Sequence, residues 1–211
     1  MKKIMMVWVL TLGLYGSTMD KAIENYAKGS YIQALNDFFT LSKKGNAQAQ
    51  YNLGIMYANG KGTKVDEKEA MKWYEKSAKQ DHAKAQYNLA TLYHKSGANN
   101  EHAFKKAKYW YEKAVKSNVM QAHNNLAALY MEGKGVEKSE LKAFELFEKS
   151  ASMGNASAKV NVAVMYAWGK EVKHNKMKAY ENFREALILG KSEASGYLDK
   201  LCTESAWVCK D

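Results

Sequence analysis

The chain of 211 residues contains the same five letters, AQYNL, at residues 49–53 and again at residues 85–89. Aligning the chain with itself extends this match into four consecutive units, at residues 47–82, 83–119, 120–155 and 156–191. Units of this length are typical of proteins in which each unit packs on its neighbours, because one unit alone cannot bury its apolar face. We therefore expect a stack of repeated units.

Each unit contains two apolar patterns with the period of an α-helix. Positions i, i+4 and i+8 lie on one face of a helix. In the first unit these stripes are Ala49, Leu53 and Tyr57, followed by Ala70, Tyr74 and Ala78. The chain has no proline, which is excluded from helix interiors and is common at sheet edges and in long loops. The sequence therefore predicts an all-α protein made of helix-turn-helix units.

The predicted helices end at regular places. Residue types that tolerate left-handed backbone follow the second helix of successive units, at Gly45, Asp81, Asn118, Gly154 and Gly190. Asp66 followed by Glu69 predicts a capping box at the start of a second helix. Shorter segments flank the units, and we interpret residues 20–46 as an N-terminal capping half-repeat and residues 192–211 as a C-terminal capping helix with a cysteine pair.

The repeated pattern A-x-A-Q-Y-N-L-G-x-M-Y-x-x-G-x-G, then K-A-x-x-W-Y-E-K-A-A, then G-N, resembles the Sel-1-like repeat, a relative of the tetratricopeptide repeat. The resemblance covers residues 20–201. It implies a right-handed α/α solenoid whose surface binds other proteins. The second unit departs from the pattern with HKSGANNEH in its turn, and the fourth has Asn182 where Trp73 and Trp110 stand in the first two.

The first residues have the order of a secretory signal peptide. Two lysines are followed by the apolar run IMMVWVLTL at residues 4–12 and then by the small residues Gly13, Gly16, Ser17 and Thr18. We predict a signal peptide at residues 1–19 and an exported protein, periplasmic or secreted, with no stable membrane insertion after the leader is removed. The alternative is a membrane anchor, but spanning a bilayer takes roughly 20 apolar residues.

The net charge of +10 raises the question of a nucleic-acid partner. The basic residues, however, alternate with acidic ones, as in KVDEKEAMKWYEKSAKQ, and form no block of like charge. This pattern is typical of solvated helix faces. We expect no nucleic-acid partner.

The two cysteines, Cys202 and Cys209, stand close to the C-terminus. On one continuous helix they would be about 10.5 Å apart along the axis, beyond the roughly 7 Å that a disulfide spans. A disulfide therefore requires the helix to end near residues 203–205. We expect a structural disulfide; the alternative, a redox-active pair, usually has C-x-x-C spacing.

No motif predicts a metal, a cofactor or catalysis. The histidines show no i, i+4 pair, neither cysteine has zinc spacing beside one, and GKGT at residues 60–63 lacks the spacing of a phosphate loop. The five histidines are His82, His94, His102, His123 and His174. We expect no cofactor. The family resemblance adds one enzymatic alternative, because some cysteine-rich relatives are described as binding or hydrolysing β-lactams, although this chain has only one cysteine pair.

One polar column runs through the first helices of all four units and consists of Asn52, Asn88, Asn125 and Asn161. These amides have two interpretations: hydrogen bonds to the backbone of the neighbouring unit, or a ladder that binds the backbone of an extended peptide. Three polar side chains share their face one turn earlier, and two tyrosines flank it. These additional candidates are Gln48, Lys84, Gln121, Tyr51 and Tyr87. In tetratricopeptide proteins, which the repeats resemble, asparagine and lysine at such positions clamp a peptide carboxylate.

The sequence thus predicts an exported, non-enzymatic scaffold that binds a peptide or protein on the concave face of the repeats. The alternatives are a β-lactam-binding or β-lactamase-like protein and, if the leader is retained, a lectin-like or regulatory protein inside the cell. The partner and the oligomeric state are not encoded in these patterns.

Overall fold

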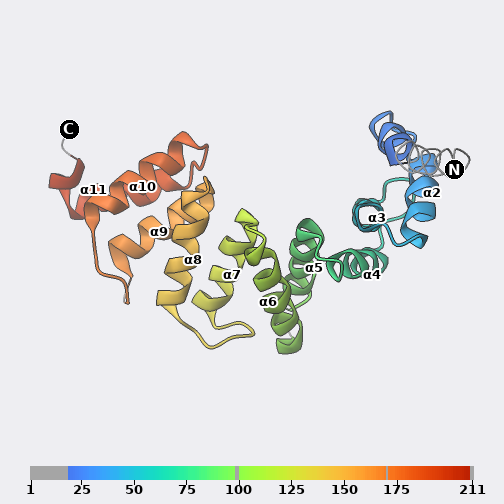
Figure 1. Ribbon diagram of the computed structural model, residues 1–211. Coiled ribbons are helices and arrows are strands. Elements are labelled where there is room, and N and C mark those ends of the chain that lie inside the picture. Colours follow the sequence, from blue (N-terminus) through green and yellow to red (C-terminus); the bar gives the residue numbers. More distant parts are fainter. Residues whose placement is uncertain (1–18, 98–99, 170, 210–211) are drawn as a thin grey trace, which may run out of the picture. The chain divides into compact units, whose positions relative to one another are not determined.

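The computed structural model describes residues 19–97, 100–169 and 171–209, and their regular secondary structure is entirely helical (Figure 1). The predicted signal peptide, residues 1–19, lies outside the described residues except for its last residue. Residues 19–27 form a first helix. The elements that follow are α2 (Tyr31–Lys43), α3 (Ala47–Asn59), α4 (Glu67–Ala78), α5 (Ala83–Ser96), α6 (Glu101–Lys116), α7 (Met120–Glu132), α8 (Glu140–Ser152), α9 (Ala156–Trp168), α10 (Lys176–Ile188), α11 (Ala194–Glu204) and the 3₁₀ helix η2 (Ala206–Cys209).

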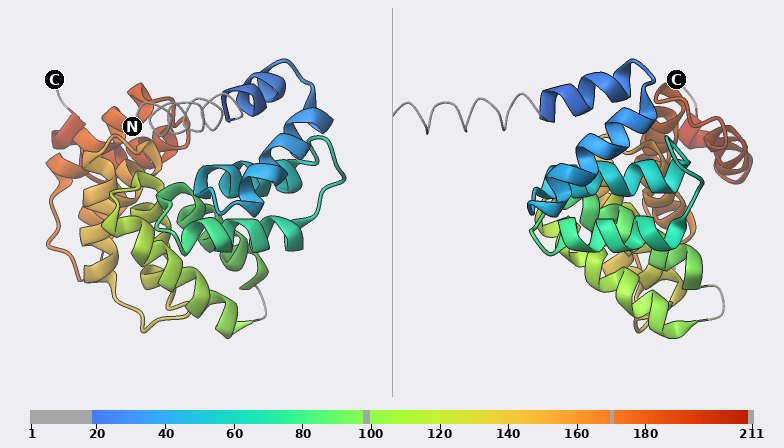
Figure 2. Two further views of the ribbon diagram at one scale, coloured as in Figure 1. Left: turned by 45° about the vertical axis from the view of Figure 1, so that its right-hand side comes forward. Right: turned by 90° about the vertical axis from the view of Figure 1, so that its right-hand side faces the viewer.

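The chain divides into two compact units, Met1–Leu92 and Tyr93–Asp211, with the boundary inside α5. In the first unit, α3 and α4 lie side by side and α3 also packs on α2 (Figure 2). Its core includes Ala22, Ala34, Phe38, Leu41, Ala49, Leu53, Met56 and Trp73. In the second unit, α7 pairs with α8 and α9 with α10, and one apolar cluster extends from Ala127 to Val208.

The predicted apolar stripes are buried. Ala49, Leu53 and Ala70 are fully buried and Tyr74 is 3% exposed, whereas Tyr57 at the end of its stripe is only partly buried. The stripes of the other units are also buried, except for partly buried residues at their ends: Tyr93, Val115, Tyr130 and Leu187. Each helix therefore contributes one face to the core and leaves the opposite face to solvent.

The predicted helix ends adopt left-handed backbone. The φ angles are +87° at Gly45, +58° at Asp81, +54° at Asn118, +92° at Gly154 and +84° at Gly190. Glycine has no Cβ to clash in this conformation, and Asp and Asn tolerate it better than other residues. The five helix ends therefore share one backbone conformation although their residue types differ.

The predicted capping box forms only in part. Asp66 Oδ1 accepts a hydrogen bond from the Glu69 N–H at 2.9 Å, but Glu69 pairs with Lys72 and does not return the bond. The Asp66 N–H instead donates to the carbonyl of Tyr57 at 2.9 Å. The same link joins Ser139 to Tyr130 at 3.0 Å and Asn175 to Tyr166 at 2.9 Å. This link closes the loop between the two helices of a repeat, which leaves no free donor for a capping box.

A second loop position contacts the preceding helix pair. Cβ atoms built on Gly62 and Gly135 would lie 2.5 Å from backbone atoms of Tyr31 and Phe104, at the start of α2 and of α6. In the fourth unit the equivalent residue is Glu171, whose carboxylate accepts a hydrogen bond from the N–H of Leu141 at 3.1 Å. A carboxylate suits this place because the first turn of α8 carries unpaired N–H groups and partial positive charge.

The C-terminus is held by the predicted disulfide. α11 ends at Glu204, so Cys209 turns back toward Cys202 and the two Cα atoms are 5.7 Å apart. Val208 of η2 is buried and joins the core of the second unit. The break in the helix is the one that the cysteine spacing requires.

Candidate functional site

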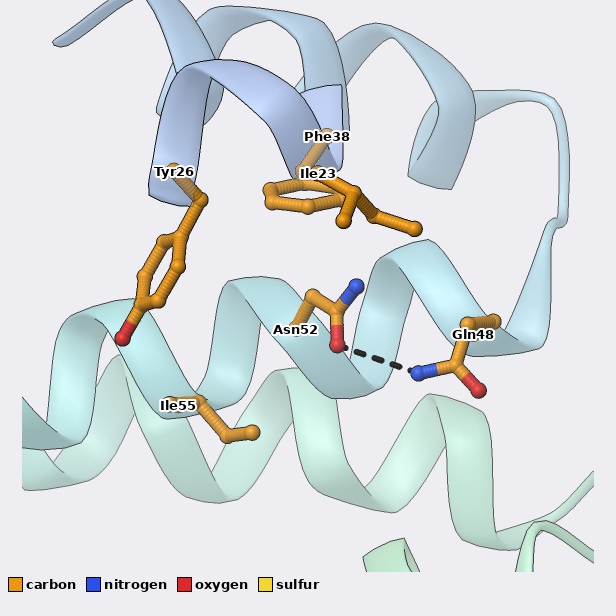
Figure 3. Close-up of a pocket in the computed structure, with 6 residues that line it drawn as sticks. All are labelled: Ile23, Tyr26, Phe38, Gln48, Asn52 and Ile55. Atoms are coloured by element: carbon orange, nitrogen blue, oxygen red, sulfur yellow. Dashed lines mark hydrogen bonds between the residues drawn. The ribbon is translucent and has the colours of Figure 1, made fainter. Parts of the chain in front are cut away.

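The candidate site is a pocket of about 270 Å³ in the first unit (Figure 3). It is lined by Ile23, Tyr26, Phe38, Gln48, Asn52 and Ile55. The first two residues belong to the helix of residues 19–27, Phe38 to α2 and the last three to α3. Two of the nine predicted binding residues, Gln48 and Asn52, therefore meet in this pocket.

Helical spacing places these side chains on facing walls. Gln48, Asn52 and Ile55 follow one another at i, i+4 and i+7 on α3, and Ile23 and Tyr26 at i and i+3 on the opposite helix. Ile23 is 48% exposed and Phe38 is buried. The pocket thus combines apolar walls with two amide groups, which is a usual composition for a ligand site.

A chain of hydrogen bonds fixes the orientation of the Asn52 amide. The Ala85 N–H donates to His82 Nδ1 at 3.2 Å, so the neutral ring carries its proton on Nε2, which donates to Gln48 Oε1 at 3.1 Å. Gln48 Nε2 in turn donates to Asn52 Oδ1 at 3.0 Å. The Asn52 Nδ2 group therefore points to the side of the pocket where Phe38 and Ile23 lie (Figure 3), and no described residue accepts a hydrogen bond from it.

His82 is held neutral by its surroundings. Burial lowers the pKa of His82 below its ordinary value of 6.5, a backbone hydrogen bond opposes this effect, and the positive charge of Lys84 lowers the pKa further. The ring stacks on Tyr51 with 4.6 Å between centroids. At neutral pH the uncharged ring can accept from Ala85 and donate to Gln48 at the same time.

Two of the four asparagines bind tyrosine hydroxyls. Asn125 Nδ2 donates to Tyr111 Oη at 3.2 Å. Asn88 is hydrogen-bonded to the hydroxyls of Tyr74 and Tyr51; burial raises the pKa of Tyr74 to about 12, and the bond to Asn88 lowers it in part. These bonds join side chains rather than an amide and a neighbouring backbone.

The remaining predicted residues do not join the pocket. Asn161 Nδ2 lies 3.5 Å from Asn124 Oδ1 in the second unit, and Asn124 also donates to Asn125 Oδ1 at 3.2 Å. Tyr51 and Tyr87 are half-buried, whereas Lys84 and Gln121 are exposed. Lys84 does not line the pocket, but its positive charge lowers the pKa of His82.

The sequence analysis missed four lining residues, Ile23, Tyr26, Phe38 and Ile55, together with His82, which orients the amides. A signal for Phe38 was present. It stands at the place of Tyr74 in the next unit, so an aromatic ring without a hydroxyl faces one asparagine and a phenol faces another. Ile23 carried no such signal, because an exposed isoleucine on a short capping helix matches no motif.

The described residues contain no group of three or more His, Cys, Asp or Glu side chains placed to hold a metal ion. In the same part of the chain, no helix has both the length and the apolar character needed to cross a bilayer. The lining residues of the pocket supply apolar groups, two amides and the phenol of Tyr26.

Comparison with known proteins relates this geometry to a family. A model of the Sel1 repeat matches residues 47–82, 83–119, 121–155 and 156–191, well over half of the chain. The chain belongs to the Sel1 repeat family. The predicted resemblance is thus confirmed, as is the all-α fold class of paired helices, and repeats of this family commonly mediate protein–protein interactions.

Solved structures show the same relationship. A Sel1 repeat protein from Oxalobacter formigenes is 30% identical, covering 90% of this chain and 74% of its own, with a TM-score of 0.79. A protective antigen of uropathogenic Escherichia coli with a Sel1-like repeat fold is 24% identical, and the match covers 92% of this chain and 50% of the antigen, with a TM-score of 0.51. An immunity protein from Pseudomonas aeruginosa is 19% identical, covering 82% and 68%, with a TM-score of 0.52. The last two likenesses show the fold alone. No curated protein matches the chain significantly.

Proposed function

We propose that this Sel1 repeat protein is an exported scaffold that binds an extended segment of a partner protein in the pocket around Asn52. The observation that supports the proposal is the Asn52 Nδ2 group, which faces the pocket without an acceptor among the described residues. Solvent reaches this donor, and a ligand that covers the pocket has to supply an acceptor in place of water to keep the donor paired. A peptide carbonyl is such an acceptor.

The pocket walls suit an apolar side chain next to that carbonyl. Ile23, Phe38 and Ile55 present hydrocarbon surface, and the 48% exposure of Ile23 leaves area that a ligand would cover. None of the lining residues in the described part of the chain is charged. An extended peptide therefore offers both required groups, a backbone acceptor and an apolar side chain, within one residue.

Export rests on the leader, residues 1–19. If the leader is a cleaved signal peptide, the protein purified from its host lacks the apolar run of residues 4–12. Mass spectrometry of the intact protein measures this directly. A mass that includes the initial residues would refute export by cleavage and leave the binding proposal untouched.

The binding proposal is tested with a minimal peptide unit, N-acetyl-leucine-N′-methylamide, added during nuclear magnetic resonance of the labelled protein. We expect saturable shifts of the Ile23 and Ile55 methyl groups and of the Asn52 side-chain amide. Asn52→Ala should weaken binding about fivefold, because one net hydrogen bond of about 1 kcal/mol is lost.

The matched control is Asn161→Ala, which removes the same side chain from the equivalent place in the fourth repeat and from a residue that does not line the pocket. This variant should bind the probe as the wild type does. Equal affinities of Asn52→Ala and the wild type, or shifts spread over the surface without saturation, would refute the proposed site.

A further inference from the structure

One aromatic position precedes every asparagine of the column by 14 residues. It lies in the second helix of one unit, and the asparagine lies in the first helix of the next. The four pairs are Phe38 with Asn52, Tyr74 with Asn88, Tyr111 with Asn125 and Phe147 with Asn161. All four pairs thus contain an aromatic ring, but only two of the four rings carry a hydroxyl.

Where the hydroxyl is present, it forms a hydrogen bond with the asparagine side chain. Tyr111 Oη accepts from Asn125 Nδ2 at 3.2 Å, and the Tyr74 hydroxyl is hydrogen-bonded to Asn88. Tyr111 is fully buried and Tyr74 is 3% exposed. In a buried setting such a bond is costly to break, because both polar groups would lose their partner.

Where the hydroxyl is absent, the asparagine takes a different partner or none. Asn161, paired with Phe147, turns to Asn124 at 3.5 Å. Asn52, paired with Phe38, accepts from Gln48, and its Nδ2 group faces the pocket on the side of the Phe38 ring (Figure 3). Phe38 is 2% exposed and lines the same pocket.

We infer that the residue at this aromatic position decides whether the following asparagine is structural or ligand-binding, and that Phe38 is the positioning residue that keeps Asn52 available. The inference rests on the function proposed above and adds its selectivity. A phenol at position 38 would place a hydroxyl where a ligand carbonyl has to lie. The phenyl ring instead supplies an apolar wall and leaves the amide donor to the ligand.

The hydrogen-bond chain from His82 determines which group of the Asn52 amide faces a ligand. Because Gln48 donates to Asn52 Oδ1, the group that Asn52 offers to the pocket is the donor Nδ2. The pocket is therefore built for a hydrogen-bond acceptor beside an apolar group. A peptide residue with an uncharged apolar side chain is the ligand class that fits.

The test variant is Phe38→Tyr, which adds one oxygen atom, and the measured quantity is its affinity for the same leucine probe. The introduced hydroxyl should bind Asn52 Nδ2, slow the exchange of the Asn52 side-chain amide protons with water in the absence of probe, and weaken probe binding by about fivefold to tenfold. Phe147→Tyr is the matched control, because it adds the same hydroxyl at the equivalent place of a unit whose residues do not line the pocket, and it should bind the probe within about twofold of the wild type.

The outcomes separate this inference from the proposed function. If Asn52→Ala weakens binding but Phe38→Tyr does not, the proposed site stands and the role of Phe38 is wrong. Equal weakening by Phe38→Tyr and Phe147→Tyr would also overturn the inference, because a hydroxyl next to Asn52 would then not be the cause.

Should Phe38→Tyr fail to fold, the reverse change in the second unit tests the same rule. Tyr111→Phe should speed the exchange of the Asn125 side-chain amide with water by about fivefold, because the hydroxyl acceptor at 3.2 Å is removed. An unchanged exchange rate would show that the hydroxyl does not hold the asparagine and would refute the inference.

Discussion

Gly54 and Gly196 offer two identical substitutions with opposite expected effects on stability. Both lie inside helices, α3 and α11, where replacing glycine by alanine stabilises a helix by about 0.5–1 kcal/mol. A Cβ on Gly54 would lie 2.5 Å from Tyr74 Cδ1 and 2.6 Å from Cε1, whereas a Cβ on Gly196 would have no atom within 4 Å. The two sites therefore differ in packing and share the change in helix propensity.

The Tyr74 ring has little room to move away from a new methyl group. It is 3% exposed, and its hydroxyl is hydrogen-bonded to Asn88. Overpacking of this kind costs about 1–3 kcal/mol. We expect Gly54→Ala to lower the free energy of unfolding by up to about 2 kcal/mol and Gly196→Ala to raise it by about 0.5–1 kcal/mol.

Urea denaturation followed by far-ultraviolet circular dichroism measures both variants against the wild type. The difference between the two changes cancels helix propensity and equals the overpacking cost, so it should be about 1–3 kcal/mol. A Gly54→Ala protein as stable as Gly196→Ala would refute the close approach of α3 and α4.

The other predictions concern the C-terminus and pH. Replacing Cys202 and Cys209 by serine removes a constraint on the unfolded chain and should lower the free energy of unfolding by about 2.5 kcal/mol, measured by urea denaturation; an unchanged midpoint would contradict it. Because the pKa of His82 is lowered below 6.5 in the folded protein, the unfolded state binds the proton more tightly. The free energy of unfolding should therefore fall as pH drops below about 6.5 and level off below the folded pKa. His82→Gln should show a smaller fall over the same pH range, and an identical pH profile would exclude His82 as the cause.

Most of the secondary structure could be predicted from local patterns. The apolar period located the helices, and glycine, asparagine or aspartate marked where they end, because few residue types tolerate a left-handed backbone. The cysteine spacing predicted a helix break that lies at Glu204. These features depend on a few neighbouring residues, so the sequence is sufficient to place them.

The capping box shows where local reasoning stops. Asp66 caps α4 as expected, but its own N–H donates to Tyr57, at the far side of the loop. The bond from the Glu69 N–H to the Asp66 side chain is a local interaction. Whether the Asp66 N–H donates to the Glu69 carboxylate or to the Tyr57 carbonyl depends on how the loop folds back on α3. Sequence spacing alone does not distinguish these two acceptors.

The candidate site could be predicted only in part. The asparagine column was visible as a repeat, but two of its members bind tyrosine hydroxyls, one binds Asn124 and one binds Gln48. Asn125 and Asn52 occupy the same place in their units, and their difference arises from one hydroxyl on a residue 14 positions earlier. That relation becomes visible once two helices of adjacent units are packed together.

The amino-acid sequence by itself determined the repeated helix pairs, their buried faces and their ends, because each follows from side-chain period and backbone preference within one repeat. Tertiary structure alone decided that Gln48 and Asn52 share a pocket with Ile23 and Phe38, and that His82 orients their amides. The physical reason is that a hydrogen-bond donor is available to a ligand only where its neighbours in space supply no acceptor, and those neighbours come from other helices.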